Sequence, residues 1–119
     1  MSSPIGPYAP AVRAGPWLVC SGQLGARQGD SGPELVSGDF EAQARQALAN
    51  VEEILGGRGV GWANVVKTTV FLAGMGHYSS FNQIYAEVLG EHRPARSVVG
   101  VASLPLGALV EVEAWAYAG

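Results

Sequence analysis

The sequence predicts an α+β fold, in which a β-sheet carries two α-helices on one face. Two regions place apolar side chains at steps of three and four residues, which is the spacing of amphipathic helices. Short apolar runs rich in β-branched or alternating residues lie before, between and after these regions and are typical of strands. The predicted order is β-β-α-β-α-β-β, with room for one more short strand.

The first forty residues are expected to form two strands and two irregular segments. Residues 2–10 are rich in Pro, Ser and Gly and predict an irregular arm. Residues 11–13 begin a strand, a Gly-Pro turn follows, and residues 17–20 form a short buried strand. Residues 25–38 are polar and contain glycines, so we expect a loop with room for one short strand.

A helix is predicted from Asp39, whose side chain can cap the first turn, to Gly56-Gly57, which can end it. A single apolar stripe runs along it: Phe40, Ala44, Ala47, Leu48, Val51, Ile54 and Leu55. We expect the polar residues Gln43, Arg45, Gln46, Glu52 and Glu53 to lie mostly on the solvent face.

The second half predicts a strand, a helix and two further strands. Residues 65–73 form a long β-branched strand, and a helix runs from about His77 or Tyr78 to Leu89. The last strands cover residues 97–101 and 109–117 and are joined by a Leu-Pro-Leu-Gly turn.

These last two strands are apolar on both faces, which indicates that both sides of the sheet are covered. Two helices can cover only one side. We therefore expect other copies of the chain to cover the second side, in a closed homo-oligomer.

The amino-acid composition limits the classes of function that the chain can have. A chain of 119 residues that is 48% hydrophobic fits a single domain over residues 1–119. Its net charge of -3 and its seven scattered Lys and Arg residues disfavour a general nucleic-acid binder, but not a nuclease with a small local site. The lone Cys20 and the lack of a signal or membrane-spanning segment predict a cytoplasmic protein.

Arg96 and Glu111 are the leading candidates for chemistry, because only 14% of the residues are charged, Arg96 directly precedes an apolar run and Glu111 lies within one. An arginine can hold a carboxylate through two parallel hydrogen bonds, and a glutamate can handle a proton or a water. We expect the pair to face one cavity that binds a small anion. The alternatives stay open that Arg96 pairs with a surface acid and that Glu111 or Glu113 is simply solvated.

Other candidates each have an ordinary structural explanation. Tyr8 could close over a pocket or pack along a surface, and Ser21-Gly22 could present backbone amides or form a turn. Asn82 could be an exposed helix residue. No zinc-type spacing of His and Cys and no phosphate-binding loop is present, and Cys20 reads as a small buried hydrophobe.

Several motifs occur together in one order, from Ile5-Gly6-Pro7-Tyr8 and Ser21-Gly22-Gln23 to Pro94-Ala95-Arg96-Ser97, Leu104-Pro105 and Glu111-Val112-Glu113. Between them lie Gln43 to Asn50, Val66 to Phe71, and Asn82 with Tyr85. In this combination the chain resembles, over nearly its whole length, the reactive intermediate deaminase family, also called YjgF or endoribonuclease L-PSP.

The resemblance implies a chorismate-mutase-like mixed sheet, a homotrimer with clefts between subunits, and an enamine/imine deaminase that needs no metal or organic cofactor. Such an enzyme hydrolyses 2-aminoacrylate-type intermediates to 2-keto acids and ammonia. Arg96 would bind the substrate carboxylate and Glu111 would handle the attacking water. Tyr8, Ser21, Gly22 and Asn82 would line the cleft, and the backbone around Val98 would contact the substrate nitrogen.

Two departures from the family pattern bear on substrate preference. Val98 stands where many relatives have cysteine, which leaves only a backbone role there, and the segment 90–93 is short. Two other functions are compatible with the resemblance: an endoribonuclease acting on single-stranded RNA, and a non-catalytic small-molecule-binding or regulatory protein.

Overall fold

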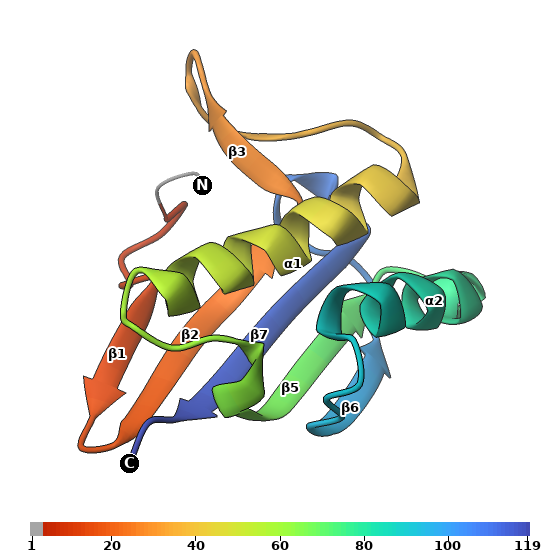
Figure 1. Cartoon of the computed structure of the whole chain (residues 1–119). Helices are drawn as coiled ribbons and strands as arrows, with labels where there is room; N and C mark the ends of the chain where they lie inside the picture. The colour runs from red at the N-terminus through yellow and green to blue at the C-terminus, as the bar shows by residue number, and fades with distance from the viewer. Residues whose placement is uncertain (1–3) are drawn as a thin grey trace.

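The computed structural model describes residues 4–119 and contains a mixed five-stranded sheet with two helices on one face (Figure 1). Only the pair β5–β6 is parallel, and the other neighbouring strands of this sheet are antiparallel. The strands, in their order across the sheet, are β1 (Ala11–Ala14), β2 (Trp17–Leu24), β7 (Val110–Tyr117), β5 (Val65–Leu72) and β6 (Ala95–Gly100).

Both predicted helices are confirmed, as α1 (Phe40–Gly56) and α2 (Tyr78–Leu89). The Asp39 carboxylate accepts a hydrogen bond of 3.0 Å from the backbone N–H of Ala42, as the capping pattern predicted. The apolar stripe of α1 lies over β2 and β7, while α2 lies over the β5–β6 side (Figure 1). No helix within residues 4–119 combines the length and apolar character needed to cross a membrane.

Strict alternation along β7 separates the two faces of the sheet. Val110, Val112, Ala114 and Ala116 have no exposed surface and pack in the core beneath the helices. The odd-numbered residues therefore face the opposite side, and on that side Trp115 and Tyr117 are 45% and 44% exposed. We call this side the open face, because no helix covers it (Figure 1).

The expectation of a loop over residues 25–38 is wrong. Two strands, β3 (Ala26–Gly29) and β4 (Gly32–Leu35), pair there as an antiparallel hairpin. Each has only four residues and lacks an alternating apolar pattern, so backbone pairing and the turn define the hairpin. Gly32 supports the turn, because its φ of 114° lies in the region that favours glycine.

Gln43 was expected on the solvent face but is only 1% exposed, so this prediction is also wrong. Its amide nitrogen donates to the carbonyl of Ser37 at 2.8 Å, and its amide oxygen accepts from the backbone N–H of Leu109 at 2.9 Å. The side chain thus ties the entry of α1 to the entry of β7. A buried amide is tolerated because both of its ends are hydrogen-bonded.

Asn50 has a similar role further along α1. It is 1% exposed, and its amide nitrogen donates to the carbonyls of Leu24 and Ala26 at 3.1 and 2.9 Å. These two carbonyls lie where the chain leaves β2 and enters β3, so Asn50 fixes the base of the hairpin against α1.

We expect Asn50→Ala to lower the free energy of unfolding by about 2 kcal/mol, because two buried carbonyls lose their donor. Denaturation by urea at a fixed protein concentration measures the change. The control Gln83→Ala, at an exposed position of α2, should change it by less than about 0.5 kcal/mol. Equal effects of the two substitutions would contradict this account of Asn50.

Candidate functional site

The residues predicted to form a site lie in two separate grooves. The first, which we call the Glu111 groove, is lined by Ile5, Gly6, Tyr8, Ser21, Gly22, Pro105, Glu111 and Glu113. The second, the Arg96 groove, is lined by Asn82, Tyr85, Ala86, Arg93, Pro94 and Arg96. Glu111 thus lies beside Tyr8, Ser21 and Gly22, and Arg96 lies beside Asn82, whereas Val98 lines neither groove.

Arg96 and Glu111 do not face one cavity within a single chain. Strand β5 lies between β6 and β7, with Thr68 paired to Arg96 and Phe71 paired to Glu111. Arg96 points to the helix-covered face, where it contacts α2, whereas Glu111 points to the open face. Because the two strands follow each other in the sequence, Arg96 and Glu111 were expected to lie on neighbouring strands.

Arg96 is held by uncharged groups rather than by a surface acid. Its guanidinium donates to the Asn82 side-chain oxygen at 2.7 Å and, more weakly, to the Tyr78 hydroxyl at 3.5 Å. The guanidinium also lies 4.9 Å from the centre of the Tyr85 ring, at cation–π distance. Because these partners are uncharged, they do not neutralise the positive charge of the guanidinium. Its further N–H groups can donate to a ligand.

Tyr78, Asn82 and Tyr85 occupy positions i, i+4 and i+7 of α2, so one helix face supplies all three contacts to Arg96. Of these three residues only Asn82 was predicted for the site, although helical spacing around it places the two tyrosines on the same face. Tyr85 is itself fixed, because its hydroxyl shares a buried hydrogen bond of 2.8 Å with the Thr68 hydroxyl. Burial raises the pKa of Tyr85, which favours the neutral hydroxyl.

Glu111 is half-buried on the open face. Burial raises its pKa above the ordinary value for glutamate, and the negative charge of nearby Glu113 raises it further. A carboxyl group with a raised pKa exchanges a proton more readily near neutral pH, which suits a general acid or base.

Gly22 makes room for the Glu111 side chain. A Cβ atom at position 22 would lie 2.7 Å from the Glu111 carboxyl carbon, closer than real contacts allow. The register of β2 against β7 shifts between Cys20 and Gln23, which is a bulge-like irregularity next to this glycine. The glycine that the sequence offered as an ordinary turn residue therefore lies within β2 and packs against Glu111.

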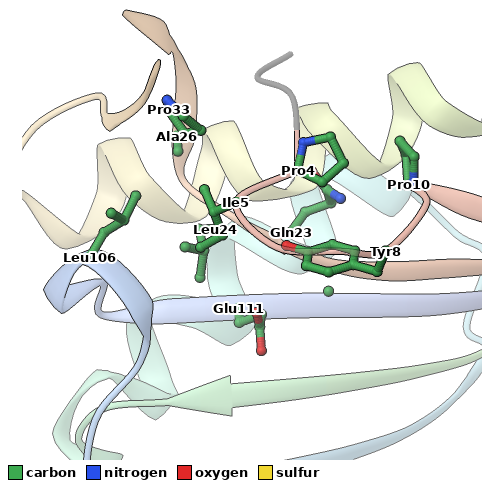
Figure 2. A pocket seen from close by; sticks show the side chains of 11 residues that line it. Pro4, Ile5, Tyr8, Pro10, Gln23, Leu24, Ala26, Pro33, Leu106 and Glu111 are labelled. Carbon is green, nitrogen blue, oxygen red and sulfur yellow. The ribbon is translucent and has the colours of Figure 1, made fainter. Parts of the chain in front are cut away.

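Ser21 holds the N-terminal arm on the sheet. Its hydroxyl donates to the Ala9 carbonyl at 2.6 Å, and its backbone N–H donates to the Pro10 carbonyl at 2.9 Å. The arm is thereby fixed where it places the Tyr8 ring beside Glu111 (Figure 2). Of the arm predicted over residues 2–10, residues 2 and 3 lie outside the described residues.

The side chains of Val98 and Cys20 are poorly placed to take part in chemistry. Val98 turns its side chain toward the core, so any contact with a ligand would come from the backbone of the edge strand β6. Cys20 is buried, and burial raises its pKa to about 11, so the thiol stays protonated near neutral pH. Across residues 4–119, no cluster of three or more His, Cys, Asp or Glu side chains is arranged to hold a metal ion.

Comparison with known proteins identifies the family. The model of the family described as endoribonuclease L-PSP matches residues 1–118 of the chain. The chain belongs to the endoribonuclease L-PSP family, also called the YjgF/RutC family. The expected resemblance is thereby confirmed over almost the entire sequence.

Members of the endoribonuclease L-PSP family with related sequences carry two kinds of name. The human 2-iminobutanoate/2-iminopropanoate deaminase is 43% identical over 115 residues, which cover 97% of this chain and 82% of the human protein. A RutC family protein of Pyrococcus horikoshii is 42% identical over 114 residues, covering 96% of this chain and 89% of that protein.

Solved structures of the endoribonuclease L-PSP family share the fold. RidA of an Antarctic Psychrobacter species matches with a TM-score of 0.90 at 35% identity, covering 98% of this chain and 92% of the other. E. coli TdcF, solved with bound serine, matches with a TM-score of 0.88 at 32% identity, covering 99% and 93%. The α+β architecture with a mixed sheet and two helices is therefore that of the family.

The raised pKa of Glu111 gives a pH-dependent prediction. The Glu111 carboxyl group binds a proton more tightly in the folded protein than in the unfolded chain. Protonation of Glu111 therefore stabilises the fold fully at low pH, and this stabilisation is lost as the pH rises through the raised pKa. Because Glu111→Gln is neutral throughout, it should stabilise the protein relative to wild type more at pH 7 than at pH 4.

Urea unfolding of both proteins at pH 4 and pH 7, at one protein concentration, measures this difference. The control Glu91→Gln removes an exposed carboxylate outside both grooves and should show little pH-dependent gain. A gain for Glu111→Gln that is larger at pH 4 would contradict the assigned environment of Glu111.

Proposed function

We propose that the protein is a 2-imino acid deaminase that hydrolyses enamine and imine intermediates of the 2-aminoacrylate type to 2-keto acids and ammonia. The observation that carries the proposal is the pair of complementary groups: a guanidinium oriented by uncharged partners, and a half-buried carboxyl group with a raised pKa. The names of relatives at about 43% identity support the same activity.

The proposed reaction needs only positioning and one proton carrier. Arg96 binds the substrate carboxylate, and the enamine takes up a proton at C3 to give the iminium form. Water adds to C2 while the electron pair of the C=N bond moves to nitrogen, and Glu111 accepts the proton that the water loses. Glu111 then returns this proton to nitrogen, the C–N bond breaks, ammonia leaves, and loss of the hydroxyl proton gives the keto acid. No metal or organic cofactor takes part in this scheme.

The remaining candidates have roles in binding. Asn82 orients Arg96, and the backbone at Val98 offers groups of an edge strand to the substrate nitrogen. On the other side, Tyr8 covers Glu111, while Ser21 and Gly22 shape the groove. TdcF of E. coli was solved with bound serine, a small molecule with one carboxylate and one nitrogen, as the proposed substrate also has.

We further propose that residues 1–119 form one chorismate-mutase-like domain and assemble as a homotrimer, with each cleft built from two subunits. The open face supports assembly, since Trp17 contacts Trp115 and Tyr117 edge-to-face, with ring centres 6.2 and 5.0 Å apart, and the last two are exposed. A second copy covering this face could bring its Arg96 toward Glu111. The buried, free Cys20 suits a reducing compartment, and we propose the cytoplasm.

Loss of each group should have a different kinetic effect. We expect Arg96→Ala to raise KM by about 10–100-fold, because a charged hydrogen-bond partner of the substrate is lost. Glu111→Gln should lower kcat by about 100-fold or more with a smaller change in KM, because the proton carrier is lost. The assay generates 2-aminoacrylate in situ and follows pyruvate.

Arg45→Gln is the control, because Arg45 pairs with Glu41 and Glu87 on the helical side of the molecule, away from both grooves. It should retain wild-type kinetics. The proposal would be contradicted if Arg96→Ala were fully active, or if the wild-type protein did not accelerate the hydrolysis of 2-aminoacrylate.

Mixing the two inactive variants tests whether the cleft is shared between subunits. When Arg96→Ala and Glu111→Gln chains are unfolded together at a 1:1 ratio and refolded, roughly a quarter of the clefts should combine an intact arginine with an intact glutamate. Activity should recover to about this fraction of wild type. If each cleft belonged to one chain, the mixture would stay as inactive as the separate variants, and sedimentation would show whether trimers formed.

The name of the family model is the observation that favours endoribonuclease activity as a second candidate. The acidic chain, with a net charge of -3, offers little to an RNA backbone. Cleavage of single-stranded RNA by wild type, lost in both Arg96→Ala and Glu111→Gln, would support this candidate. Tight ligand binding without turnover, measured by thermal shift, would instead indicate the regulatory alternative.

A further inference from the structure

The Arg96 groove contains a second guanidinium, which the proposed reaction does not use. Arg93 lines this groove together with Arg96, and the lining includes no Asp or Glu side chain among the described residues. Two positive charges in one groove repel each other, and anionic groups that bind beside them relieve this repulsion. A substrate with one carboxylate compensates only one of the two charges.

The loop that carries Arg93 is held in place between α2 and β6 (Figure 1). Gly90 ends α2 with a φ of 68°, a conformation that favours glycine. The ring nitrogen Nε2 of His92 forms a hydrogen bond of 2.8 Å with the Val65 carbonyl, which ties the loop to the start of β5. Pro94 follows Arg93 and restricts the backbone of Arg93 to extended conformations. These constraints reduce the ordering that a ligand of Arg93 would have to impose.

Uncharged oxygen atoms orient the guanidinium of Arg93, as they orient that of Arg96. Its Nη1 atom donates to the backbone carbonyls of Gly90 and His92. Neutral carbonyls do not compensate the positive charge, and the other N–H groups of the guanidinium can donate to a carboxylate. The groove therefore presents two oriented guanidiniums to an anionic ligand.

The environment of Tyr85 indicates that both positive charges act on the same part of the groove. Burial is the largest influence and raises the pKa of Tyr85, whereas the hydrogen bond with Thr68 lowers it. The charges of Arg96 and Arg93 lower this pKa as well. Because salt solution screens charges beyond a short distance, both guanidiniums must lie near the Tyr85 hydroxyl to have this effect.

We propose that Arg93 is a specificity-determining residue, which binds a second carboxylate while Arg96 binds the first, so that the protein favours 2-imino dicarboxylic acids over 2-imino acids with one carboxylate. The inference rests on the proposed deaminase function. A planar guanidinium matches the two oxygens of a carboxylate, and two guanidiniums in one groove match a dicarboxylate. A monocarboxylate of the same length leaves the charge of Arg93 uncompensated, which disfavours it relative to the dicarboxylate.

Calorimetry with 2-oxoglutarate and 2-oxopentanoate tests the proposal, because these keto acids have equal numbers of carbon atoms and differ in the second carboxylate. We expect wild type to bind 2-oxoglutarate at least about tenfold more tightly, since a charge-assisted hydrogen-bond partner is added. In Arg93→Gln the difference should fall to about twofold or less, while the affinity for 2-oxopentanoate stays unchanged.

Two further variants serve as controls. Arg93→Lys keeps the positive charge but not the planar fork, and should retain part of the preference. Arg27→Gln removes an equal charge at an exposed position of β3 outside both grooves, and should leave both affinities unchanged.

Three results would overturn the proposal. The first is equal binding of the two keto acids by wild type. The second is an Arg93→Gln variant that binds both keto acids equally weakly relative to wild type, because Arg93 would then only support its loop. The third is tighter binding of inorganic phosphate than of 2-oxoglutarate, which would assign the groove to phosphate.

A kinetic measurement separates this inference from the proposed function. Amino acid oxidases produce the imines of glutamate and norvaline in situ, and semicarbazide traps each imine as an absorbing semicarbazone, so hydrolysis by the protein appears as reduced trapping. We expect wild type to have the higher kcat/KM for the glutamate-derived imine, and Arg93→Gln to lose this preference. Tighter binding of 2-oxoglutarate without hydrolysis of any imine would contradict the deaminase proposal and retain the role of Arg93. Hydrolysis of both imines with equal kcat/KM, together with equal binding of both keto acids, would do the reverse.

Discussion

The burial of every second residue of β7 is the constraint on which the rest of the structure depends. Val110, Val112, Ala114 and Ala116 have no exposed surface, and a shift of one residue would place Glu111 and its odd-numbered neighbours in the core instead. Because β7 lies between β2 and β5, its register also fixes the strands on both sides. The position of Glu111 on the open face thus follows from core packing, and not from any interaction of its own.

The same constraint divides the candidate site between two faces. Arg96 belongs to β6 at the sheet edge and turns toward α2, while Glu111 lies two strands away on the opposite face. A small ligand cannot contact both groups of one chain through the sheet. Either the two grooves act independently, or a second copy supplies the missing half, and the exposed aromatic side chains of the open face favour the second possibility.

Patterns within short stretches of sequence predicted most helices and strands. They could not predict how these elements are arranged in the sheet. The Asp39 cap, the apolar stripe of α1 and the bounds of α2 follow from spacing that any short window contains. The strand order does not, because only packing decides that β5 separates β6 from β7. Arg96 and Glu111 therefore seemed to be neighbours. Gln43 was misplaced for a related reason: its hydrogen-bond partner, the backbone N–H of Leu109, lies 66 residues further along the chain.

The features that reduce the stability of the fold lie close together, around the Glu111 carboxyl group. The helical layer obeys capping, periodicity and burial, whereas the open face beside Glu111 combines a half-buried carboxyl group, a glycine within a strand and a leucine with φ of 62°. Each of these features costs stability in isolation: the carboxyl loses hydration, Gly22 has no side chain to pack within its strand, and Leu106 adopts a strained backbone. Their meeting around the Glu111 carboxyl group is difficult to explain by packing. It is the arrangement expected where a fold gives up stability to hold a reactive group and a small molecule together.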